Sequence, residues 1–223
     1  MTSIAKRYIC SSIGKKQVMA ITGLMLVMFL LAHLIGNFLF LLGPDAFNSY
    51  GHAMINNPLL IPMELGLLAI FVSHLVLAIW TTIENKSARP TPYYFKTTRG
   101  GGSNFASSTM PYTGLVILIF LIAHLIHFKY GTYYTTTVSE VEMRDLYKLV
   151  VEYFQNKIWV LWYIFAMIST GVHVSHGFQS VFQSLGINHP RFTPTIKKMS
   201  WGVGLFIGIG FSALAVFAHL KGV

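Results

Sequence analysis

Charged residues, acidic ones above all, and cysteine are scarce in this sequence. Of 223 residues only 10% are charged, with 16 Lys and Arg against 7 Asp and Glu, whereas 54% are hydrophobic. A water-soluble domain usually carries roughly a quarter of charged residues, so most of the surface of this chain should face lipid. The one cysteine, Cys10, excludes an internal disulfide, a cysteine-only zinc site and an iron–sulfur cluster held by this chain alone.

The formal net charge of +9 does not indicate nucleic-acid binding. The basic residues occur in short segments between apolar runs, and they form neither a basic stripe nor a known nucleic-acid-binding motif. We therefore expect membrane lipid, and no nucleic acid, as a partner.

Five apolar runs are long enough to cross a membrane. Each holds about 20 residues, which covers a hydrocarbon layer of ~30 Å at about 1.5 Å per residue. The runs use nearly the whole chain, so we predict one all-α domain over residues 1–223, an integral membrane bundle of five transmembrane helices. We expect no internal repeat among the runs. The predicted spans are about 18–42, 59–83, 110–128, 158–182 and 199–220.

The basic residues also predict the direction of the spans. They gather before the first span and in the 84–109 and 183–198 segments, whereas the 43–58 segment has none. Cytoplasmic loops are enriched in Lys and Arg, so we expect the N-terminus and these two segments in the cytoplasm. The first, third and fifth spans then run outward, in a multi-pass protein of the cytoplasmic (inner) cell membrane.

Three connecting segments have an interpretable composition. We predict an outer loop over 43–58. The 131–157 segment contains a helix-like, loosely amphipathic stretch, Val138–Tyr153, which we expect on the outer surface. The triple glycine Gly100–Gly102 is interpreted as part of a flexible connector rather than a phosphate loop, because no strand precedes it and no G-K-[ST] follows.

Four of the nine histidines, His33, His74, His124 and His173, lie deep inside predicted spans. Ionisable groups are costly there and usually face a cofactor or a water-filled cavity. One such histidine could be a packing residue, but one in each of four spans is harder to explain in that way. From the rise per residue, His33 and His124 stand ~20 Å from the cytoplasmic boundary, and His74 and His173 ~20 Å from the outer one. The topology therefore predicts an outer pair, His33 with His124, and an inner pair, His74 with His173.

Two imidazoles at one depth on different helices suit the iron of a six-coordinate b-type haem. Two such haems, stacked across the bundle, would form an electron path through the membrane. The sequence has no C-x-x-C-H, so neither haem would be covalently attached. A histidine-dependent metal transporter and a proton relay are the alternatives. The transporter would be expected to add carboxylates or thiols, and the relay would need carboxylates in the middle of the membrane.

Further polar residues lie near these positions. His127 and His176 follow two of the candidate ligands by three residues, on roughly the same helix face. We expect them to hydrogen-bond or to contact haem propionates, with alternate ligation as the other interpretation. Glu64, at the outer mouth of the second span, is a candidate proton acceptor in quinol oxidation, or else an interfacial anchor. His52 is a second candidate for the quinone site, or an ordinary loop histidine.

Many of these residues belong to longer motifs. The motifs are His33-Leu34-x-x-Asn37, Gly43-x-x-Ala46-Phe47-Asn48-Ser49-x-x-His52-x-Met54, Thr113-Gly114 with His124 ten residues after the glycine, and Ser169-Thr170-x-x-His173-x-Ser175-x-Gly177. Together they resemble the di-haem cytochrome b membrane anchor of succinate:quinone oxidoreductases and quinol:fumarate reductases, and the resemblance extends over essentially all five spans.

The resemblance implies an anchor for a flavoprotein subunit carrying FAD and an iron–sulfur subunit, both on the cytoplasmic side. It assigns His33 and His124 to a distal haem and His74 and His173 to a proximal haem. Electrons would pass between menaquinone and the iron–sulfur subunit, while the succinate and fumarate chemistry belongs to the flavoprotein, so this chain would be no enzyme on its own.

One position departs from that family. Gly171 stands where some di-haem fumarate reductases carry a glutamate that returns protons across the membrane, so a proton path through this position is not expected. The nearest alternative function is a di-haem cytochrome b anchor of another respiratory enzyme, of the formate dehydrogenase or hydrogenase type.

Overall fold

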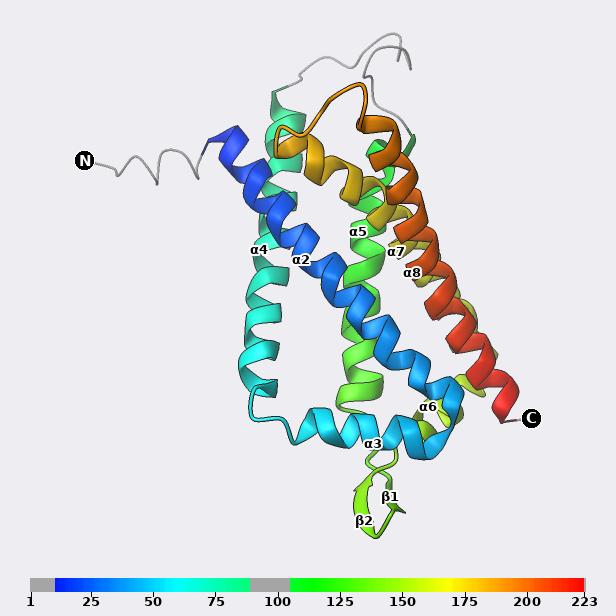
Figure 1. Cartoon of the computed structure of the whole chain (residues 1–223). Helices are drawn as coiled ribbons and strands as arrows, with labels where there is room; N and C mark the ends of the chain where they lie inside the picture. Colours follow the sequence, from blue (N-terminus) through cyan, green and yellow to red (C-terminus); the bar gives the residue numbers. More distant parts are fainter. Residues whose placement is uncertain (1–10, 89–104, 223) are drawn as a thin grey trace.

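The computed structural model describes residues 11–88 and 105–222, and within them the chain is an all-α bundle (Figure 1). Five long helices are apolar enough to cross a membrane, which confirms the predicted fold class and the five spans. The triple glycine lies outside the described residues. The long helices are α2 (Ser12–Phe38), α4 (Leu60–Ser87), α5 (Phe105–His124), α7 (Lys157–Ser184) and α8 (Thr193–Lys221).

Several helices continue past their apolar runs at the end of the bundle predicted to be cytoplasmic. The start of α2 is capped by Ser11, whose side chain accepts a hydrogen bond from the Gly14 amide at 3.0 Å. An N-cap of this kind satisfies an amide that has no partner in the first turn. Polar residues can thus stay helical beyond the hydrocarbon layer, which explains why hydropathy alone placed these helix ends too far inward.

An ion pair joins two of these helix extensions. Lys15 of α2 is 5% exposed and pairs with Glu84 near the end of α4. Trp80 donates from its indole nitrogen to the same carboxylate at 2.7 Å, and its ring centroid lies 4.8 Å from the Lys15 ammonium. The α2 and α4 helices are therefore fastened together at this end.

The opposite end of the bundle holds short elements that the sequence analysis did not predict. The 43–58 segment is not a loop but contains α3 (Pro44–Ile55), which follows a 3-10 turn, η1 (Leu39–Leu42). Gly43 between them has φ +107°, a conformation that glycine adopts readily. Proline at the helix start and Asp45 in the first turn are both helix-initiating signals.

The prediction of a helix over Val138–Tyr153 was wrong for its first half. The chain there forms an antiparallel hairpin of β1 (Thr135–Val138) and β2 (Val141–Arg144), and only then α6 (Leu146–Phe154). Ser139 and Glu140 adopt positive φ angles of 49° and 66°, as the tightest hairpin turns require. A run of threonines favours the strand, and this local preference prevails over the loose helical periodicity.

A buried asparagine connects the two short helices at this end. Asn48 of α3 is 1% exposed; its amide nitrogen donates to Asp145 at 2.9 Å, and its oxygen accepts from the Tyr147 amide at 2.9 Å. Asp145 in turn caps α6 by accepting from the Lys148 amide at 2.9 Å. The α3 and α6 helices therefore form one hydrogen-bonded cover over the end of the bundle (Figure 1).

Helix α7 packs against α2, α5 and α8, whereas α4 packs mainly against α2. Where α7 meets α8 their backbones touch through glycines. A Cβ placed on Gly204 would lie 2.7 Å from the Cβ of Ser175 and would also collide with the Gly171 carbonyl. Small residues permit such close approach of membrane helices, so Gly204 is needed for this interface.

Substitution of Gly204 by alanine should therefore destabilise the protein by about 1–3 kcal/mol through overpacking. Gly202→Ala is the matched control, because a Cβ at that exposed position of the same helix meets nothing within 4 Å and alanine favours helix. Thermal loss of helical circular dichroism in detergent measures both variants. Equal stability of the two would show that the close contact is unimportant.

Candidate functional site

The four span histidines come from four helices: His33 from α2, His74 from α4, His124 from the last residue of α5 and His173 from α7. Each of these residues is partly buried. Since no two of them share a helix, any contact between them depends on how the bundle packs.

The structure brings the outer pair together. The ring centroids of His33 and His124 are 5.9 Å apart, and their planes are perpendicular. Two imidazoles on opposite sides of one metal ion would have centroids roughly 6 Å apart, given metal–nitrogen bonds of about 2 Å. Two rings in edge-to-face contact without a metal have a similar centroid distance. The spacing therefore permits a shared metal without requiring one.

Aromatic rings surround this outer pair. Phe29 stacks on His33 at 5.4 Å and Phe120 stacks on His124 at 5.5 Å, while Phe128 meets His124 edge-on. The Nδ1 atom of His124 is buried without a hydrogen-bond partner among the described residues. An apolar cage with two imidazoles and few competing polar groups suits a flat, hydrophobic, metal-carrying group such as a b-type haem.

The inner histidines each contact a neighbouring helix through Nδ1. The Nδ1 atom of His74 lies 3.3 Å from the Thr22 hydroxyl and 3.2 Å from the Met19 carbonyl oxygen of α2. The Nδ1 atom of His173 lies 3.0 Å from the Thr113 hydroxyl of α5.

Glycines make room for these inner rings. The Cε1 atom of His74 lies 3.0 Å from the place where a Cβ on Gly23 would be, and that of His173 lies 3.6 Å from a Cβ on Gly114. Sequence reasoning missed the role of Thr22 and Gly23. The available signal was the Thr-Gly dipeptide, which stands ahead of His33 as it does ahead of His124.

Within the described ranges, no cluster of three or more His, Cys, Asp or Glu side chains could hold a metal ion. A haem iron needs only two protein ligands, because the macrocycle supplies the other four. The two histidine pairs therefore remain the candidate iron-binding residues of this chain.

The structure separates His127 from His124, although the two are three residues apart. The segment Leu125–Lys129 forms a π-helical turn, η2, which changes the direction of the side chains that follow His124. Such turns are often found at functional sites. His127 points to α6 and α7, where it hydrogen-bonds to the Tyr153 hydroxyl and lies 4.7 Å from the Trp159 ring centroid. His176 is partly buried on α7, one turn beyond His173.

The two quinone-site candidates lie at the end of the bundle covered by α3 and α6. Glu64, near the start of α4, forms an ion pair with Lys129 at the end of η2. His52 lies on α3, where its Nε2 accepts a hydrogen bond from the Asn56 side-chain amide next to the same helix at 2.9 Å. Glu84 is a second acidic residue on α4, because this helix extends beyond the predicted span.

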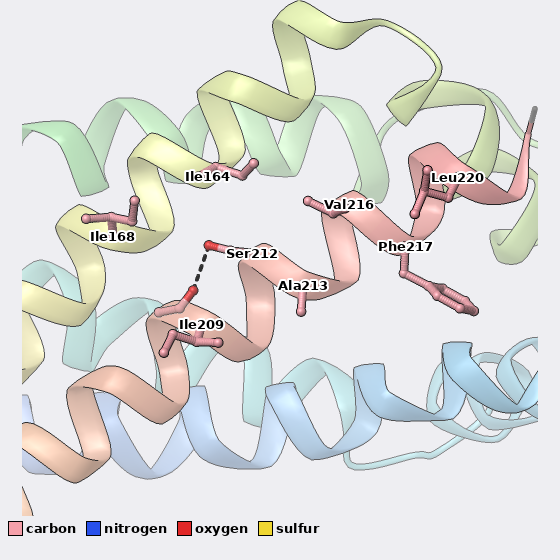
Figure 2. A pocket seen from close by; sticks show the side chains of 9 residues that line it. Ile164, Ile168, Ile209, Ser212, Ala213, Val216, Phe217 and Leu220 are labelled. Atoms are coloured by element: carbon pink, nitrogen blue, oxygen red, sulfur yellow. Dashed lines mark hydrogen bonds between the residues drawn. The ribbon is translucent and has the colours of Figure 1, made fainter.

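A groove of about 540 Å³ lies between α7 and α8, and none of the residues that line it is a histidine (Figure 2). Its lining is almost wholly apolar, as with Ile168 and Val216, and the hydroxyl of Ser212 is used within α8, where it donates to the Gly208 carbonyl at 2.7 Å. The groove offers no titratable side chain among the described residues that line it, so the polar chemistry of the chain is elsewhere.

The hydrogen bond between Tyr153 and His127 is the clearest polar link between α6 and the end of α5. Burial raises the pKa of the Tyr153 hydroxyl, which therefore stays protonated and can donate. Tyr153→Phe should lower the free energy of unfolding by about 0.5–1.5 kcal/mol. Tyr133→Phe, at a residue 68% exposed, should leave it unchanged. Denaturation in detergent compares the two, and equal effects would contradict the assigned bond.

Comparisons with models of protein families, with curated proteins and with solved structures found no match to this chain. The candidate site therefore rests on the residues and geometry of the chain itself.

Proposed function

We propose that this chain is a di-haem cytochrome b that anchors a succinate dehydrogenase or fumarate reductase in the cytoplasmic membrane. It would carry electrons between menaquinone and an iron–sulfur subunit. The observation that carries the proposal is the outer pair, His33 and His124, with ring centroids 5.9 Å apart from two different helices inside an aromatic cage.

Two haem b groups, when bound, would each supply an iron that gains and loses one electron. The residues of the chain would hold them: His33 with His124 at the outer level, and His74 with His173 at the inner level. Thr22 contacts His74 and so marks the inner level on α2. His33, at the outer level, follows on the same helix after 33 − 22 = 11 residues. Eleven helical residues span roughly 16 Å, so the two levels are stacked along the bundle.

The direction of the bundle supports the placement of the partners. The polar helix extensions with Lys15 and Glu84 lie at the end nearest the inner pair. Positive charge favours the cytoplasmic side, so an FAD-carrying flavoprotein subunit and an iron–sulfur subunit would bind there. The motifs that resemble the membrane anchors of succinate:quinone oxidoreductases favour these partners over those of a formate dehydrogenase or hydrogenase.

For the quinone site we favour the neighbourhood of Glu64. Its carboxylate lies at the outer end of α4 beside Lys129, near the level of the outer pair. Oxidation of a quinol releases protons, and a carboxylate at the rim of the membrane can accept one. His52, which hydrogen-bonds to Asn56 at the end of α3, is a weaker candidate.

The proposal is tested by measuring haem b per chain. The protein is purified from its native membrane with its partners, the haem is quantified as pyridine haemochrome, and the chain by amino-acid analysis. A value near two with a low-spin bis-histidine spectrum and co-purifying FAD is expected. A molybdenum or nickel partner would instead identify the alternative enzyme class. Absence of haem would overturn the cytochrome function and favour a metal transporter.

Alanine variants of the four histidines should fall into two groups. His33→Ala and His124→Ala should lose the same haem, and His74→Ala and His173→Ala the other, because each iron needs both of its imidazoles. Redox titration of the remaining haem identifies which one is lost. His189→Ala, at an exposed position, is the control and should keep both. The assignment would be contradicted if one variant from each pair, such as His33→Ala and His74→Ala, lost the same haem.

Glu64→Gln should keep both haems but slow their reduction by a naphthoquinol about a hundredfold, since the amide cannot accept the proton. Stopped-flow absorbance of the haem bands measures this rate without the partner subunits. Glu142→Gln, which alters an exposed carboxylate on β2, is the matched control. An unchanged rate in Glu64→Gln would remove this residue from the quinone site.

A further inference from the structure

The first and third spans share a similar stretch of sequence. TGLMLVMFLLAHLI at 22–35 aligns without gaps to TGLVILIFLIAHLI at 113–126, with nine of the fourteen positions identical. The expectation that the spans contain no internal repeat was therefore wrong for this pair. The repeat includes the Thr-Gly dipeptide at one end and the outer histidine at the other.

The two copies of the repeat also make equivalent contacts. The hydroxyl of Thr22 meets Nδ1 of His74, and the hydroxyl of Thr113 meets Nδ1 of His173. In both cases the histidine belongs to the next span along the chain, α4 after α2 and α7 after α5. The chain thus contains two similar units, each with one threonine, one outer histidine and one inner histidine.

Each of the two threonine hydroxyls also has a backbone carbonyl of its own helix to which it can donate. The Thr22 hydroxyl donates to the Val18 carbonyl at 2.9 Å, and that of Thr113 donates to the Met110 carbonyl at 3.1 Å. A hydroxyl has a single hydrogen to donate but can also accept. With the hydroxyl hydrogen directed to the carbonyl, each threonine oxygen can accept a hydrogen bond from the histidine Nδ1.

The Met19 carbonyl independently assigns the donor role to Nδ1 of His74. It lies 3.2 Å from Nδ1 of His74, and a carbonyl can only accept. The Nδ1 atom of His74 must therefore carry the hydrogen. In the neutral imidazole Nε2 is then unprotonated, and its lone pair can bind a metal. Thr113 occupies the equivalent place in the second unit, which favours the same tautomer for His173.

We propose that Thr22 and Thr113 are a matched pair of positioning residues for the inner iron site. They hold His74 and His173 as Nδ1–H tautomers, with both Nε2 lone pairs free to bind one iron. The inference rests on the proposed function, since it needs an iron between these rings. An acceptor at Nδ1–H also makes the imidazole a stronger electron donor, which stabilises the oxidised iron.

The test is redox titration of the purified protein, with spectra of both haems, in Thr22→Val, Thr113→Val and the double variant. Valine keeps the shape but removes the acceptor, so the midpoint potential of one haem should move upward, furthest in the double variant. The other haem should stay unchanged. Thr22→Ser and Thr113→Ser, which keep the hydroxyl, should restore the parent potential. Thr170→Val is the control, because its buried hydroxyl bonds to the Ala166 carbonyl of its own helix.

Each result decides the proposal. Two haems with parent potentials in the valine variants would overturn the positioning role while leaving the proposed function intact. If the valine variants lose the inner haem, retention in the serine variants supports the proposal, and loss in both series overturns it. A parent protein without haem would overturn the proposed function itself, and the iron-positioning role with it.

Discussion

In a hydrocarbon layer a polar group without a partner inside the protein is costly, and several polar side chains of this bundle meet that constraint. Hydroxyls within the spans satisfy themselves locally, as when Ser169 and Thr170 donate to carbonyls one turn back at 2.8 Å. The inner histidines instead make their Nδ1 contacts with a neighbouring helix, which gives them a defined orientation.

Close packing of two helices accounts for the glycine at position 171. A Cβ at this position would lie 2.7 Å from the Gly204 carbonyl oxygen on α8, so no larger side chain fits without separating the two helices. A glutamate there, as in some di-haem fumarate reductases, would need a different packing of the fifth span. The glycine is thus explained by the close contact between α7 and α8, and the two features are expected to change together.

The spans could be predicted because hydropathy reports directly on the lipid environment, and the outer pair because depth along a straight helix depends only on residue count. Other features depended on interactions that composition does not encode. The α3 helix was missed although Pro44 and Asp45 mark its start, and the hairpin turn at Ser139 interrupts a stretch with helical periodicity. The surroundings of His127 depend on a π turn, and the role of Thr22 became visible only when its contact with His74 was known.

The buried core around Val27 links the beginning of the chain to its end. Val27 of α2 packs with Val174 of α7 and Ile207 of α8, which lie 174 − 27 = 147 and 207 − 27 = 180 residues later. At a synthesis rate of about 5–20 residues per second, roughly 7 to 36 seconds separate the synthesis of Val27 from that of these two residues. The surface of the first span around Val27 therefore lacks these two packing partners until the fourth and fifth spans have been synthesised.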